Sequence, residues 1–231
     1  MNRRVVAGAL LGAVLISGCS NDGDQAKGGP AAKVTTMPDG PPFTPLTTAA
    51  PANEVPGALS GQPSLARVAE VAAAGPSRLE AETFALAVAH LFTDSRPGFS
   101  AEQMLRLVAA RAMPTELRSY LTLELDGLRK LGWGQHYDTS LEMWIRSAPH
   151  GDPGRPHRVD VEVFAHDATE ATGSGSWSQL RFGVVRQDEE WRLLESSGGP
   201  VRGDDGEPAD LTPAQRKKFL TGPGWRRIPP A

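Results

Sequence analysis

The 231-residue sequence contains a single cysteine, Cys19, and this scarcity excludes several kinds of site. No disulfide can form within the chain, and the sequence offers neither a multi-cysteine zinc site nor a Cys-x-x-Cys redox motif. Stability outside the cytoplasm must therefore come from a packed core. The sequence also lacks a serine-centred nucleophile elbow and a phosphate-binding glycine loop.

The apolar run at the N-terminus, residues 5–16, is too short to cross a membrane, which requires about 20 apolar residues. It follows Arg3 and Arg4 and precedes the small residues Ser17 and Gly18. A short basic region, an apolar region and a small-residue cleavage site are the parts of a secretory signal peptide. We therefore expect the chain to be exported and residues 1–18 to be removed.

The stretch Ile16-Ser17-Gly18-Cys19 resembles the lipobox of bacterial lipoproteins. This resemblance implies that the Cys19 thiol carries diacylglycerol, that cleavage occurs before it, and that the new amino terminus is acylated, for example with palmitate. Two or three acyl chains, at about 0.8 kcal/mol per buried methylene, make a stable membrane anchor. The alternative is an ordinary secretory signal in which the cysteine stands by chance. We expect a lipid-anchored protein on the outer side of the cell membrane.

Charge and composition limit the partners and divide the chain. Residues 1–18 contain two arginines and no acid, so their removal changes the net charge from −3 to −5. An acidic protein is poorly suited to bind nucleic acid through its own charge. Residues 19–64 are rich in proline, glycine and alanine, as expected of a disordered tether. Residues 65–200 should form the folded domain, and residues 201–231 a tail.

Two periodicities predict the fold class. Helical spacing and capping residues predict three helices, near 78–92, 100–113 and 115–132, and an Ala-rich segment near 64–74 could form a short helix before them. Thr212 with Pro213 predicts a short helix over 212–220. Apolar and polar residues then alternate over four strand segments, near 141–146, 159–166, 179–184 and 191–193. We therefore expect an α+β domain, with N-terminal helices packed on a curved antiparallel sheet of about four strands.

The order of these elements, and the final hairpin from Arg181 to Leu193, resemble the NTF2-like (cystatin-like) superfamily. This resemblance implies a strongly bent sheet forming a cone with a pocket at its mouth. Within the superfamily, anchored envelope proteins of actinobacteria are similar in architecture. So are assembly components of conjugation machines, although these usually have a true transmembrane helix.

Acid–base chemistry on this fold, as in ketosteroid isomerase or related cyclases, implies a base in the cone with hydrogen-bond donors opposite. Weak catalytic candidates are Asp160, Glu162 and His166, with Asp167 beside them and Tyr137 ahead of the first strand. If the valines of the 159–165 segment face the helices, the first three face away, and a solvated sheet face is the simpler interpretation.

Trp144 and Phe164 fall on the polar faces of their strands. They could complete a second small core, line a pocket or form an interface, and packing is the favoured interpretation. The histidines of the loop 149–156 and its surroundings have no metal-ligand spacing, and no cofactor is expected.

Three functions remain open. The first is a non-enzymatic binding or scaffold module for an envelope protein or a small apolar ligand. The second is an accessory component of a conjugation or secretion apparatus. The third is a small-molecule isomerase or cyclase.

Overall fold

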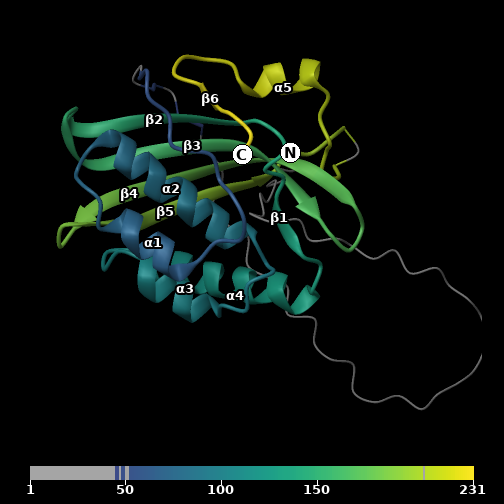
Figure 1. Ribbon diagram of the computed structural model, residues 1–231, viewed down its shortest axis with the longest axis horizontal. Helices are drawn as coiled ribbons and strands as arrows, with labels where there is room; N and C mark the ends of the chain where they lie inside the picture. Colours follow the sequence, from purple (N-terminus) through teal and green to yellow (C-terminus); the bar gives the residue numbers. More distant parts are fainter. Residues whose placement is uncertain (1–44, 47, 50–51, 205) are drawn as a thin grey trace, which may run out of the picture.

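The computed structural model describes residues 45–46, 48–49, 52–204 and 206–231. Residues 1–18, Cys19 and most of the predicted tether lie outside the described residues, so the expectations for them stay predictions. The described part is an α+β domain in which four consecutive helices precede an open antiparallel sheet (Figure 1). The predicted fold class is confirmed at this level.

The helices lie where local sequence signals predict them. They are α1 (Leu65–Ala72), α2 (Arg78–Thr93), α3 (Ala101–Val108), α4 (Thr115–Leu131) and α5 (Pro213–Phe219). Capping boxes begin α2, α3 and α5, because in each the side chain of the cap and that of the third helical residue bond each other's backbone N–H groups. Gly132 ends α4 with φ = 65°, a conformation that favours glycine.

One predicted helix boundary is wrong. Helix α3 ends at Val108 rather than near residue 113, because Ala109 is extended and forms a bridge to Leu193, and the Ala110 N–H donates to the Leu193 carbonyl over 2.8 Å. A tertiary contact thus ends this helix. Helix α4 begins at Thr115, where its predicted range begins, and Pro114 occupies its cap without a side-chain hydrogen bond.

The sheet has six strands in the described part of the chain, so the expected number of about four is wrong. They are β1 (Gln135–Tyr137), β2 (Met143–Asp152), β3 (Arg155–Thr169), β4 (Ser174–Gln187), β5 (Glu190–Pro200) and β6 (Arg226–Ile228). Their order is β5-β4-β3-β2-β6, and β1 pairs with the far end of β3, beyond β2. The two strands that periodicity missed, β1 and β6, are three residues long, which is too short for an alternating pattern.

The main core lies between the helices and one face of the sheet. Val159, Val161 and Val163 of β3 are fully buried there with apolar side chains of α2, α3 and α4. The expectation that these valines face the helices is confirmed. Since neighbouring strand residues point to opposite faces, the residues between the valines lie on the second face.

The C-terminal residues cover part of that second face. Helix α5 and its flanks contribute Leu211, Phe219 and Trp225 to a second apolar cluster with Phe164 and Trp177 of the sheet. Strand β6 pairs with β2 at the edge of the sheet. The segments 201–204 and 206–231 therefore contribute residues to the folded unit, as do some residues before 65: Leu46 is buried, and Val55 and Leu59 pack against the main core.

Candidate functional site

Asp160 and Glu162 lie on the second face of β3 as predicted, but they are not solvated. Their exposed fractions are 4% and 0%, and that of His166 is 9%. Arginines of neighbouring strands and the C-terminal residues cover this face, so the interpretation as a solvated face is wrong. The sequence pattern placed the three side chains on one face correctly but could not show what lies over it.

Asp160 is held by two arginines. Its carboxylate accepts hydrogen bonds from Arg158 Nε over 2.8 Å and from Arg181 Nη2 over 2.7 Å. Burial alone would raise the pKa of Asp160, but the hydrogen bonds and charges of the two arginines hold it below its ordinary value. This carboxylate is ionised and fully engaged, which makes it unsuitable as a proton-transferring base near neutral pH.

Glu162 is also occupied. Its carboxylate accepts hydrogen bonds from Arg146 Nε over 2.7 Å, from the Leu46 N–H over 3.2 Å and from the Gln179 side-chain amide. Arg146 is itself buried and lies directly opposite Glu162 on β2, with its guanidinium 4.6 Å from the centre of the Trp225 ring. These contacts are those of a structural ion pair between the sheet and the segments that cover it.

His166 lies between two acidic side chains at the end of the same face. Its Nδ1 is 3.6 Å from Asp138 and its Nε2 is 3.5 Å from Asp210, and its ring centre lies 5.3 Å from that of Trp177. Nothing in this arrangement brings His166 to Asp160 or Glu162, because Phe164 lies between them on the strand. The three candidates do not form a common site.

Trp144 and Phe164 form part of the second core. Phe164 is fully buried, stacked on Trp177 with ring centres 5.0 Å apart and on Phe219 at 5.8 Å. Trp144 is half-buried beside them, and Arg216 of α5 lies over the rings of Trp144 and Trp177. The packing interpretation of these two aromatic residues is confirmed.

Asp167 differs from the other candidates because it points to the opposite, helix-facing side of β3. It lies directly across from Tyr137 of β1 and accepts a hydrogen bond at Oδ2 from the Ser178 hydroxyl of β4. Asp167 is 5% exposed, and its Oδ1 has no hydrogen-bond partner among the residues that the structure describes. The structure thus brings together Asp167 and Tyr137, two candidates from separate segments.

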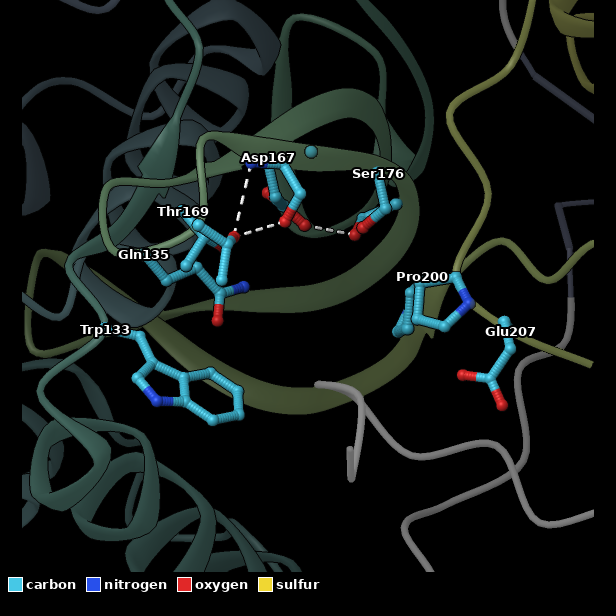
Figure 2. A pocket seen from close by; sticks show the side chains of 12 residues that line it. Trp133, Gln135, Asp167, Thr169, Ser176, Pro200 and Glu207 are labelled. Atoms are coloured by element: carbon cyan, nitrogen blue, oxygen red, sulfur yellow. Dashed lines mark hydrogen bonds between the residues drawn. The ribbon is translucent and has the colours of Figure 1, made fainter. Parts of the chain in front are cut away.

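A pocket of about 370 Å³ opens in front of Asp167 (Figure 2). Trp133 and Gln135 lie on one side of it, and Pro200 and Glu207 on the other. The hydroxyl side chains that line the pocket are Thr169, Thr172, Ser174, Ser176 and Ser178. Of these residues, only Asp167 was a candidate from the sequence, because the lining comes from four separate segments that only the fold brings together.

Burial dominates the electrostatics of this site. It raises the pKa of Asp167 to about 7, although the hydrogen bond from Ser178 acts in the opposite direction. Burial, together with the nearby charge of Asp167, also raises the pKa of Tyr137, which keeps this phenol protonated. Near neutral pH, Asp167 is therefore divided between its acid and its carboxylate forms.

No known protein family, curated protein or solved structure matches the chain significantly. The geometry of the Asp167 pocket is therefore the basis for proposing a function.

No helix in the described ranges has the length and apolar character needed to span a bilayer. This part of the chain contains no group of three or more His, Cys, Asp or Glu side chains that could hold a metal ion. His150 instead lies 3.3 Å from Asp160, at the edge of the arginine cluster.

Proposed function

We propose that the chain is a lipid-anchored protein of the bacterial cell envelope whose α+β domain binds a small molecule in the Asp167 pocket. The anchor is supported by the sequence around Cys19, with its basic residues, apolar run and small pair before the cysteine. A relationship to the NTF2-like superfamily is part of the proposal. The order of helices before an antiparallel sheet, with a pocket on the helix-facing side, supports it.

The observation that carries the proposal is the unpartnered Oδ1 of Asp167 at a pocket wall. A buried polar atom without a partner costs roughly 1–3 kcal/mol, so buried polar atoms are normally hydrogen-bonded. A ligand that donates a hydrogen bond to Oδ1 would recover this cost. The pocket volume lies in the range of small-molecule sites, which combine apolar walls with a few convergent polar groups.

Binding is favoured over catalysis because the acid–base candidates are dispersed. Asp160 and Glu162 are engaged by arginines on the second face, and Tyr137 does not line the pocket. An isomerase or cyclase is the second candidate, supported by the raised pKa of Asp167 next to a buried phenol. A module that binds a protein partner through Trp144 or Phe164 needs an exposed apolar surface there, and the burial of Phe164 gives this form of binding no support. The assembly-component alternative would require co-purification with subunits of a membrane complex.

Ligand-detected NMR with a fragment library tests the proposal on the detergent-solubilised full chain. The variant Ser176→Trp places a large side chain in the pocket without removing Asp167, and Leu123→Trp, at an exposed position of α4, is the matched control. We expect fragments that bind the wild type and Leu123→Trp but not Ser176→Trp. Circular dichroism verifies that both variants fold. Absence of binders, or binders that tolerate Ser176→Trp, would contradict the proposal.

A further inference from the structure

The charge around the Asp167 pocket has one sign. Asp167 lies at its inner wall and Glu207 at its edge, and the remaining lining residues are uncharged (Figure 2). Among the residues that the structure describes, no lysine, arginine or histidine lines it. An anionic ligand would meet the carboxylate of Asp167 at the inner wall and that of Glu207 at the edge, and like charges at short range disfavour binding. The pocket therefore selects against anions.

The uncharged lining residues suit a group with several hydrogen-bond donors. The hydroxyl oxygens of Thr169, Ser176 and Ser178 can accept hydrogen bonds, as can the side-chain carbonyl of Gln135. Trp133 adds an indole wall, and aromatic rings attract organic cations through the negative potential over their faces. A carboxylate, several hydroxyl acceptors and one indole together match an ammonium group.

We propose that the Asp167 pocket binds a small organic amine, whose ammonium group pairs with Asp167 while its carbon chain lies along Trp133. This inference rests on the proposed function, since it names the class of ligand for the same site. An ammonium ion has three donors, so one can reach Oδ1 of Asp167 and the others the hydroxyls beside it. The pairing supplies a cation to a buried carboxylate whose Oδ1 has no hydrogen-bond partner in the described part of the chain.

Protons compete with an amine for the Asp167 carboxylate, so the affinity for the amine should depend on pH. Tyr137 of β1 and Ser178 of β4 contact or face Asp167, Glu207 lies at the pocket edge, and His90 of α2 lies against Tyr137 with ring centres 6.3 Å apart. Of these groups, Asp167 is the one that pairs with the ammonium ion, and its carboxyl must be deprotonated to do so. Amine affinity is expected to fall about tenfold for each unit of pH below the pKa of Asp167, because the carboxyl must lose its proton first.

Two matched probe sets test the class of ligand by isothermal titration on the detergent-solubilised full chain. One set is putrescine, butanediol and succinate, and the other is phenethylamine, phenylethanol and phenylacetate, so that each amine has a neutral and an anionic counterpart. We expect an amine to bind, and its alcohol and acid counterparts to bind at least tenfold more weakly. Asp167→Asn should weaken amine binding at least tenfold, whereas Asp188→Asn, an exposed carboxylate on the β4–β5 turn, should not.

The outcomes separate this inference from the proposed function. Amine binding that is lost in Asp167→Asn and weakens below neutral pH supports the inference. Equal binding of amine and alcohol, unchanged amine binding in Asp167→Asn, or no amine binding while Ser176→Trp blocks other fragments overturns the amine but leaves the pocket as a ligand site. Absence of any Ser176-dependent ligand overturns both.

Discussion

Arg226 forms a buried ion pair with Glu82, which lies 144 residues before it in the sequence. Arg226 Nη2 lies 2.5 Å from Glu82 Oε1, and the two side chains are 10% and 1% exposed. Glu82 also accepts a hydrogen bond from Arg78 Nε over 2.9 Å and one from the Ser147 hydroxyl. This contact joins β6, the last strand of the chain, to α2, which supplies much of the main core.

We predict that Arg226→Gln lowers the free energy of unfolding by about 2–3 kcal/mol, because it removes one partner of a buried charge while Arg78 still compensates part of it. Arg227→Gln is the control on the same strand, since Arg227 is 64% exposed and pairs with Glu142 at the surface. Its effect should stay within about 0.5 kcal/mol. Urea unfolding followed by fluorescence measures both. Equal effects of the two variants would show that the buried pair is unimportant.

Asp167 gives a stability that depends on pH. Its pKa is about 7 in the folded protein and 3.8 in its ordinary setting, so the folded state favours the protonated form. Asp167 therefore adds to the free energy of unfolding below pH 4. This contribution, at most about 4 kcal/mol, is lost as pH rises through 7. Asp167→Asn should therefore be more stable than the wild type at about pH 8 and similar to it at about pH 4.

Asp160 provides the control of opposite sign, because its arginines lower the pKa of the carboxyl. Asp160→Asn should be destabilising at neutral pH, and its deficit should shrink in acid as the wild-type carboxyl protonates. Unfolding in urea across the pH range, compared variant by variant, checks both. A stability difference between wild type and Asp167→Asn that is constant with pH would contradict the prediction.

Phe164→Ala tests whether this residue acts in packing or in binding a partner. Because Phe164 is fully buried between Trp177 and Phe219, we expect a loss of about 3–5 kcal/mol in the free energy of unfolding. The control Leu123→Ala, at a position that is 51% exposed, should change it by about 0.5 kcal/mol or less. A partner-binding residue would behave like Leu123 in the isolated protein.

The anchor is tested at Cys19, which lies outside the described residues. Cys19→Ala removes the thiol that the lipobox resemblance assigns to lipid. We expect loss of metabolic labelling with a palmitate analogue and release of the protein from the membrane fraction, while Cys19→Ser controls for side-chain size. Labelling and membrane retention that survive both substitutions would rule out the anchor.

The helices were largely predictable because their signals are local. The capping pairs Ser77 with Glu80 and Ser100 with Gln103 lie within four residues of sequence, and both are present in the structure. The end of α3 was not predictable, since it depends on a contact between Ala109 and Leu193. The strands β1 and β6 were missed for a related reason: only pairing with β3 and β2 defines three-residue strands.

The site was predictable only in its central residue. Asp167 could be named as an acid–base candidate from its type and strand position, but strand register decides that Tyr137 and Ser178 surround it. The same dependence on register explains the error over Asp160 and Glu162. Arg146 and Arg181, which hold Glu162 and Asp160, lie on neighbouring strands, and alternation within one strand carries no information about the next.

The position of β6 and of the helix that covers Phe164 has a consequence for biogenesis. Residues 213–228 leave the ribosome after the other strands of the sheet, so a nascent chain at first holds Phe164, Trp177 and Glu82 without the segment that shields them. The outer face of the sheet is covered only after these residues have emerged. A chain cut short before residue 213 would keep the aromatic side chains of this face open to proteases and to association with other chains.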